Sequence, residues 1–159
     1  FVYYHPDLRA EDLMDAFRDN SIKGIIGAIG GEDTIRLLPY IDYDVIRNNP
    51  KIFMGYSDTT INHFMMQKAG LVSFYGPSIM TDFGEYVKMF DYTKNAVNNI
   101  LFNDADGLEI KSSKYWSSDF IPWSIENINK QKELRKEMHG YEVLQGNGVV
   151  TGKVIGGCI

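Results

Sequence analysis

The residues of this chain best suited to chemistry are the six from 55 to 60, Gly-Tyr-Ser-Asp-Thr-Thr. An apolar run, residues 52–54, leads into them, and a helical pattern over residues 61–69 follows. Ser57 is therefore expected on a tight turn between a strand and a helix, near helical N–H groups that stabilise negative charge. This arrangement suits a serine nucleophile, as in the G-x-S-x-G elbow of other hydrolases, although Thr59 replaces the last glycine. A simple helix cap is the alternative, because Ser and Asp are favoured there.

A second turn is formed by Gly30 and Gly31, which close an apolar and β-branched run over residues 22–29. Such a run is typical of a strand that is buried on both faces of a parallel sheet. Because loops at the carboxyl ends of parallel strands form the ligand crevice, this turn and the Ser57 turn can face one crevice. Backbone N–H groups of Gly31 and Asp58 could then bind a developing oxyanion. The simpler interpretation is that the two glycines only make a tight turn.

A serine nucleophile needs a base, and the chain has three histidines, at positions 5, 63 and 139. The spacing of six residues turns His63 away from Ser57 on the helix, so we expect it at the helix surface or in packing. The other two are also expected at the surface, which places the base outside this piece of chain. No grouping of His, Asp and Glu has the spacing of metal ligands, so no metal is predicted.

Two tryptophans, Trp116 and Trp123, lie in a polar and aromatic stretch over residues 112–124. Exposed aromatic side chains on a loop commonly stack on ligands or anchor interfaces. Packing of both rings onto the surrounding domain is the alternative, and the sequence leaves the choice open.

Strand and helix patterns alternate through the first hundred residues. Helical patterns cover residues 10–18, 34–38, 61–69 and 91–102, and strand patterns cover residues 22–29, 52–54 and 71–75. The alternation predicts an α/β domain over residues 1–105, with a parallel sheet, flanking helices and right-handed crossovers. Short strand-like pieces at 108–110 and from residue 141 onward alternate with polar loops and glycines. They predict the beginning of a β-rich domain over residues 106–159.

The composition limits the class of protein. With 159 residues, 44% of them hydrophobic, the chain is expected to be soluble and globular. Its net charge of −5 argues against a nucleic-acid partner, and no apolar run approaches the roughly 20 residues of a membrane span. The single cysteine, Cys158, is compatible with the cytoplasm. The chain begins at Phe1 without Met and stops at Ile159 in an apolar run, which suggests an internal piece of a larger protein.

Several stretches, taken in order, resemble the LD-carboxypeptidase family of serine peptidases, in particular its microcin-immunity (MccF-type) branch. They cover nearly the whole chain and are residues 9–17, 29–31, 36–42, 49–51, 55–60, 75–77 and 152–157. The resemblance implies a Ser-His-Glu triad with Ser57 as nucleophile, and oxyanion donors at the backbone N–H groups of Gly31 and Asp58. It places the first β/α unit before Phe1, and the histidine and glutamate after residue 157. The isolated piece is therefore expected to be inactive.

The resemblance also implies a small peptide-like or aminoacyl-nucleotide substrate and no cofactor. Residues 116–123 resemble the loop of MccF-type enzymes whose second tryptophan stacks on the nucleobase, which assigns Trp123, together with Trp116 and Gly30, to substrate binding. These enzymes cleave the amide between an acyl-amino acid and a nucleotide, whereas other members release D-alanine from a murein tetrapeptide. A non-catalytic α/β ligand-binding domain is an interpretation from another class. The family often forms dimers, so a homodimer stays open; at Cys158 it often has asparagine.

Overall fold

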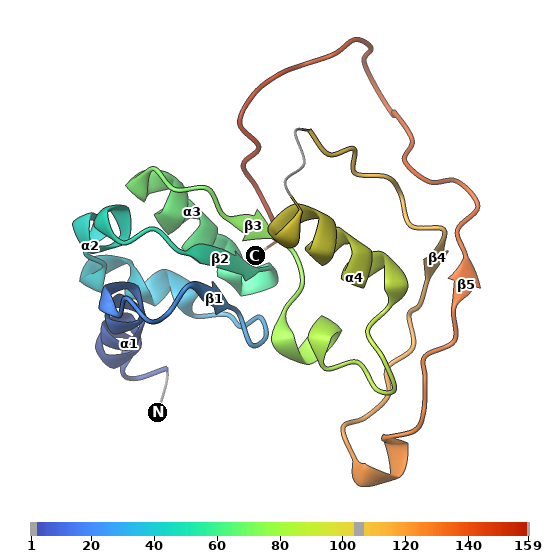
Figure 1. Cartoon of the computed structure of the whole chain (residues 1–159), viewed down its shortest axis with the longest axis horizontal. Coiled ribbons are helices and arrows are strands. Elements are labelled where there is room, and N and C mark those ends of the chain that lie inside the picture. The colour runs from blue at the N-terminus through green and yellow to red at the C-terminus, as the bar shows by residue number, and fades with distance from the viewer. Residues whose placement is uncertain (1–2, 104–106, 159) are drawn as a thin grey trace. The chain divides into compact units, whose positions relative to one another are not determined.

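The computed structural model describes residues 3–103 and 107–158 (Figure 1). Their contacts define two compact units, which we call the α/β unit, Phe1–Phe83 with Val154–Ile159, and the loop-rich unit, Gly84–Lys153. The α/β unit is thus made of two separate pieces of chain. The predicted domain boundary at residues 105 and 106 lies outside the described residues and stays a prediction. No helix in the described part of the chain has the length and apolar character needed to cross a membrane.

The α/β unit is built on a parallel sheet of three strands in the order β1-β2-β3 (Figure 1). The strands are β1 Gly24–Ile26, β2 Ile52–Gly55 and β3 Phe74–Tyr75. Ile25 pairs with Phe53, and Gly55 pairs with Tyr75, so the carboxyl ends of neighbouring strands meet at one edge of the sheet. The predicted α/β class with a parallel sheet and flanking helices is confirmed. The turns that follow β1 and β2 share this edge.

The helices of this unit are α1 Pro6–Arg18, α2 Tyr43–Asn48, α3 Thr60–Ala69 and the 3-10 helix Thr34–Tyr40. Their ends follow from local chemistry. Pro6 suits the first turn of α1, where no N–H partner is needed. The Asp42 carboxylate caps α2 by accepting hydrogen bonds from the N–H groups of Asp44 and Val45. Gly70 ends α3 at a φ of 87°, a conformation that glycine adopts without cost.

The apolar core of the α/β unit joins the helices to β2. Its buried members are Ala10, Met14, Phe17, Leu37, Ile46, Phe53, Ile61, Met65, Met66 and Ala69. Burial of each large side chain stabilises the fold by about 1.5–3 kcal/mol. Phe53 precedes the Ser57 turn and Ile61 follows it, so core contacts hold the chain on both sides of the candidate nucleophile.

The strand predicted over residues 22–29 is shorter than expected. Only Gly24–Ile26 form β1, and Ile26 keeps 38% of its surface exposed, so the expectation of burial on both faces is wrong. The reason is position, since β1 is at the edge of the sheet and pairs only with β2 among the described strands. Gly27 still bonds to Met54 through its N–H at 2.8 Å. The chain then turns into the loop that carries Gly30 and Gly31.

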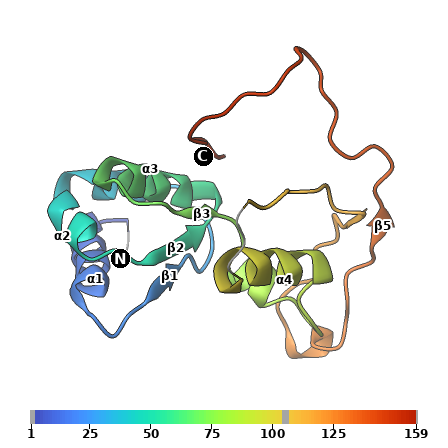
Figure 2. The ribbon, with the colours of Figure 1, turned by 45° about the horizontal axis from the view of Figure 1, so that its top comes forward.

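The loop-rich unit contains α4 Asp91–Val97, which continues into a π-helical turn, Asn98–Phe102, and a two-stranded antiparallel ribbon. The ribbon pairs β4 Tyr115–Trp116 with β5 Arg135–Lys136, so Trp116 lies on a strand rather than in a loop. The segment after β5 runs without helix or strand up to residue 153 (Figure 2). The strands predicted at 108–110 and beyond 141 do not form in the described residues, because a strand needs a partner and only β4 and β5 pair here. The β-rich domain itself stays a prediction.

Candidate active site

Ser57 has a backbone conformation that serine rarely adopts. Its φ is 60°, in the left-handed region, which costs an L-residue roughly 1–2 kcal/mol. Ser57 directly follows Tyr56 at the end of β2 and opens a 3-10 turn, Ser57–Thr59, that leads into α3. A strained serine between a strand and a helix is the local geometry of a nucleophile elbow, in which the hydroxyl is held away from the sheet.

Hydrogen bonds around the elbow offset this strain. The Thr59 hydroxyl donates to the carbonyl of Tyr56, and the Thr60 hydroxyl donates to the carbonyl of Ser57 at 2.6 Å. The N–H of Ser57 donates to the Tyr75 hydroxyl at 3.3 Å. Each such bond contributes about 1 kcal/mol, so the three together are sufficient to offset the cost of the Ser57 conformation.

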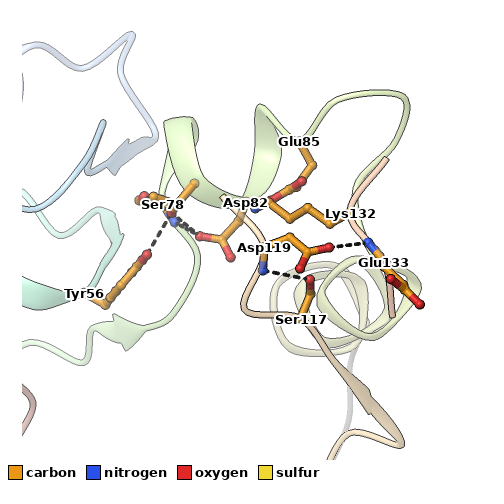
Figure 3. A network of polar contacts seen from close by, with 9 residues as sticks. Tyr56, Ser78, Asp82, Glu85, Ser117, Asp119, Lys132 and Glu133 are labelled. Atoms are coloured by element: carbon orange, nitrogen blue, oxygen red, sulfur yellow. Dashed lines mark hydrogen bonds and ion pairs between the residues drawn. The ribbon is translucent and has the colours of Figure 1, made fainter. Parts of the chain in front are cut away.

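Tyr56 is also tied to the segment after β3, as Figure 3 shows. Its hydroxyl donates to Thr81 Oγ1 at 2.9 Å, and the Thr81 hydroxyl in turn donates to the Asp82 carboxylate at 2.6 Å. The N–H of Ser78 donates to the same carboxylate at 3.0 Å, and Ser78 is fully buried. The residue before the candidate nucleophile is thus fixed through both its backbone and its side chain.

Gly30 approaches Ser57 so closely that no side chain fits. A Cβ on Gly30 would lie 2.8 Å from both Cβ and Oγ of Ser57, well inside van der Waals contact. On the other side of the turn, a Cβ on Gly55 would lie 2.9 Å from Oγ1 of Thr59. Gly30 is therefore required because it lies so close to the candidate nucleophile. The simpler interpretation, in which the glycine only makes a tight turn, does not account for this contact.

Asp58 anchors the loop that carries Gly30 and Gly31, which we call the glycine loop. One carboxylate oxygen of this buried residue accepts hydrogen bonds from the N–H groups of Asp33 and Thr34, at 3.2 and 3.0 Å, and from the Thr34 hydroxyl at 2.6 Å. These N–H groups open the 3-10 helix that begins at Thr34, where a negative charge is favourable. A Cβ on Gly31 would lie 2.9 Å from this oxygen. Asp58 therefore fixes the loop relative to Ser57.

The two N–H groups predicted as oxyanion donors are not used in hydrogen bonds of the fold. Within residues 3–103 and 107–158, neither the N–H of Gly31 nor that of Asp58 donates a hydrogen bond. A Cβ on Gly30 would lie 3.8 Å from the Asp58 nitrogen, so the loop and the elbow meet at this point. The start of α3 adds the positive end of a helix dipole close by.

His63 is a packing residue, which is the second of the two positions expected for it. It is buried, with Nε2 2.9 Å from the carbonyl of Gly55 and Nδ1 2.8 Å from the Ser73 hydroxyl. Because a carbonyl only accepts, Nε2 carries the proton and Nδ1 accepts from Ser73. Burial lowers the pKa of His63 below its usual value, which favours the neutral ring. Both ring nitrogens are engaged, so His63 is not placed to take a proton from Ser57.

The carboxyl-terminal piece of the α/β unit docks beside the elbow. The N–H of Cys158 donates to the Tyr75 hydroxyl at 3.0 Å, and its carbonyl lies 2.9 Å from the Thr60 hydroxyl, whose single proton is shared between this carbonyl and that of Ser57. The Tyr75 oxygen also lies 3.3 Å from the Cys158 sulfur. A Cβ on Gly157 would clash with both Thr60 and Tyr75. The glycines before Cys158 thus let the backbone reach the start of α3.

The loop-rich unit holds both tryptophans. The Arg135 guanidinium lies 5.3 Å from the centre of the Trp116 ring, whereas Trp123 contacts Tyr86 with ring centres 5.4 Å apart. Figure 3 shows how the chain between them is secured: the Asp119 N–H donates to the Ser117 hydroxyl at 3.2 Å. The Asp119 carboxylate accepts from a backbone N–H just before β5, that of Glu133, at 2.8 Å. Glu85 and Lys132 form an ion pair in the same unit (Figure 3).

Comparison with known proteins decides the family. Residues 1–76 match the family described as the LD-carboxypeptidase N-terminal domain. The chain is also 36% identical over 151 residues to the microcin C7 self-immunity protein MccF of Escherichia coli, an alignment that covers 94% of this chain and 43% of that protein. Residues 1–76 belong to the LD-carboxypeptidase family.

Solved structures agree with this assignment to the LD-carboxypeptidase family. The crystal structure of an MccF-like protein from Streptococcus pneumoniae in complex with AMP matches with a TM-score of 0.82 and 36% identity, over 92% of this chain and 43% of that one. MccF in complex with aspartyl sulfamoyl adenosine matches with a TM-score of 0.72 and 35% identity, over 82% and 40%. The chain thus spans less than half the length of these relatives.

Four of the residues predicted for this LD-carboxypeptidase site lie together in the α/β unit, namely Gly30, Gly31, Ser57 and Asp58. Trp116 and Trp123 belong to the loop-rich unit. Sequence reasoning missed two contributions: Tyr75 as an acceptor for the Ser57 N–H, and the Asp58 side chain as an anchor of the glycine loop. A local pattern signals neither one, because the partners are 18 and 24 or more residues apart in the chain.

Proposed function

We propose that Ser57 is the nucleophile of a serine peptidase of MccF type. The observation that carries the proposal is the strained elbow, with φ of 60° at Ser57, pressed against Gly30 so that only hydrogen fits between them. A helix cap needs neither feature, since capping residues ordinarily have extended backbone conformations. Membership in the LD-carboxypeptidase family supports the same assignment.

The reaction would be acyl transfer from an amide to water. A histidine outside residues 1–159, oriented by a glutamate, takes the proton of Ser57 as Oγ attacks the scissile carbonyl carbon. The carbonyl oxygen becomes an oxyanion, held by the N–H groups of Gly31 and Asp58. The amine leaves with the proton from the histidine, and water then attacks the acyl-enzyme and restores Ser57. The 159-residue piece alone is therefore expected to be inactive.

The proposed substrate is the amide that joins an acyl-amino acid to a nucleotide. Two similar structures support this choice, since one is in complex with AMP and the other with aspartyl sulfamoyl adenosine. Trp123 is proposed to stack on the nucleobase, a contact worth about 1–3 kcal/mol in single-stranded nucleic-acid binding. Trp116 and Gly30 are proposed as further substrate contacts.

The test uses the full-length protein and the variant Ser57→Ala, offered aspartyl sulfamoyl adenosine. We expect the variant to bind this compound as tightly as the wild type but to lose at least about a thousandfold in hydrolysis, because the nucleophile is gone. Ser21→Ala is the matched control, since Ser21 is an exposed serine of the same unit. Unimpaired hydrolysis by Ser57→Ala would rule out the nucleophile.

The same assay separates the substrate classes. Release of D-alanine from a murein tetrapeptide, with no cleavage of the aminoacyl nucleotide, would replace the MccF-type activity by that of a murein LD-carboxypeptidase. Binding without cleavage of either compound by the wild type would indicate a ligand-binding domain instead of an enzyme.

A further inference from the structure

Tyr86 contacts Trp123 through its ring and holds the main chain around it through its hydroxyl. The two ring centres are 5.4 Å apart, with the planes tilted by 47°. The N–H of Ser124 donates to the Tyr86 oxygen at 2.8 Å. The Tyr86 hydroxyl in turn lies 3.3 Å from the carbonyls of both Pro122 and Ser124, either of which can accept its proton. One side chain thus binds the residues before and after Trp123.

A second side chain fixes the same turn. The Asn127 amide donates to the carbonyl of Pro122 at 2.8 Å, and Asn127 is among the few buried polar residues of the loop-rich unit. The 3-10 helix Ile125–Asn127 that places it begins directly after Ser124. The main chain that carries Trp123 is therefore held by Tyr86 and Asn127, while 56% of the Trp123 surface stays exposed.

Trp116 is in a different environment. The Arg135 guanidinium lies over its ring at 5.3 Å, and Arg135 is itself paired with the Asp119 carboxylate at 3.6 Å. A nucleobase that stacked on this face of Trp116 would have to displace Arg135 and disturb its ion pair. Among the described residues no cation lies over the Trp123 ring, which contacts the Tyr86 ring and is largely exposed, so a base could stack on it without such a cost.

We propose that Tyr86 is a positioning residue that holds Trp123 as a preformed stacking surface for the nucleobase. The inference rests on the proposed function, in which Trp123 binds the base. A ring that is already ordered before binding loses little conformational freedom when the ligand arrives, so preorganisation raises affinity. Removal of the Tyr86 hydroxyl frees the Ser124 side of the turn, while the bond from Asn127 to Pro122 stays, and it should weaken recognition of the base, not of the rest of the substrate.

The experiment measures calorimetric affinity of the full-length protein, in the Ser57→Ala background, for two probes. One is aspartyl sulfamoyl adenosine and the other is the same aspartyl sulfamate with ribose but no base. Tyr86→Phe should weaken binding of the first probe about three- to tenfold and leave the second unchanged. Tyr92→Phe is the matched control, because it also removes a tyrosine hydroxyl bond in this unit, to the carbonyl of Lys111.

The outcomes separate this inference from the proposed function. Equal weakening of both probes by Tyr86→Phe would show a general structural role and overturn the inference. Wild-type affinity in Tyr86→Phe, with Trp123→Ala weakened, would overturn the inference alone. Absence of binding of the first probe by the parent protein, or full affinity in Trp123→Ala, would overturn both the nucleotide assignment and the inference.

Discussion

The hydroxyl of Tyr75 accepts a hydrogen bond from the backbone N–H of Ser57 across 3.3 Å. Tyr75 is the last residue of β3 and pairs with Gly55, the last residue of β2. The contact therefore joins the end of one strand to the turn that follows its neighbour. The same oxygen accepts from the Cys158 N–H at 3.0 Å, so a single hydroxyl binds the elbow to the carboxyl-terminal piece of the unit.

Tyr75→Phe removes both of these hydrogen bonds and keeps the ring, whose centre is 5.5 Å from that of His63. We expect kcat to fall about tenfold with little change in KM, because the loss of about 1 kcal/mol per bond lets the elbow relax without altering substrate contacts. Steady-state kinetics of the full-length variant measure this. Tyr40→Phe, at an exposed position, is the control. A wild-type kcat in Tyr75→Phe would contradict the role of the Tyr75 hydroxyl in holding the elbow.

Gly30→Ala places a methyl group 2.8 Å from Cβ and Oγ of Ser57. Overpacking of this kind costs about 1–3 kcal/mol, and here the group that must move is the nucleophile. We expect hydrolysis to fall at least about a hundredfold, whereas thermal stability should fall by no more than this packing cost. Gly24→Ala is the matched control, since its methyl group would be at an ordinary 3.5 Å from Ile52. Normal hydrolysis by Gly30→Ala would show that the loop does not confine Ser57.

Asp58→Asn tests the anchor beneath the glycine loop. The amide oxygen of Asn can take the place of the one carboxylate oxygen that accepts from Asp33 and Thr34, but it carries no negative charge, so it accepts these hydrogen bonds more weakly. Hydrogen bonds to a charged group contribute about 1.5–3 kcal/mol, and we expect the free energy of unfolding to fall by about 2 kcal/mol, together with activity. Chemical denaturation measures it, with exposed Asp12→Asn as control. Unchanged stability would mean that the carboxylate is not a structural anchor.

His63 predicts a dependence of stability on pH. Burial lowers the pKa of its folded form below that of the unfolded chain, so below about pH 6.5 the unfolded state binds more protons. The contribution of neutral His63 to the free energy of unfolding is therefore complete above this pH and is lost as the pH falls. Thermal unfolding between pH 7.5 and 5 should therefore show a smaller acid-side decline in His63→Gln than in the wild type. Equal declines in His63→Gln and the wild type would refute the effect.

Local features of the site follow from the sequence because their causes are local. The apolar run of β2, the turn residues and the helix that ends at Gly70 lie within twenty residues, so pattern and capping rules place Ser57 between a strand and a helix. The strain at Ser57 is different. It depends on Tyr75 and on Gly30, which other elements bring to the turn.

Strand patterns failed where no partner was available. Val149 and Val150 have strong β propensity, yet their side chains are almost fully exposed and their backbone pairs with no described strand. Propensity favours an extended chain, but only a neighbouring strand supplies the hydrogen bonds of a sheet. The sequence left the choice between surface and packing open for His63 for a related reason, because its partners, Gly55 and Ser73, flank α3 on either side in the chain.

The division of the α/β unit into two pieces of chain has a consequence for its synthesis. Thr60 and Cys158, which share a hydrogen bond, are 98 residues apart. At about 5–20 residues per second, a ribosome needs about 5–20 s to add that interval. The whole loop-rich unit is translated within it. The turn that carries Ser57 can therefore gain its contact with Cys158 only after the loop-rich unit has been synthesised.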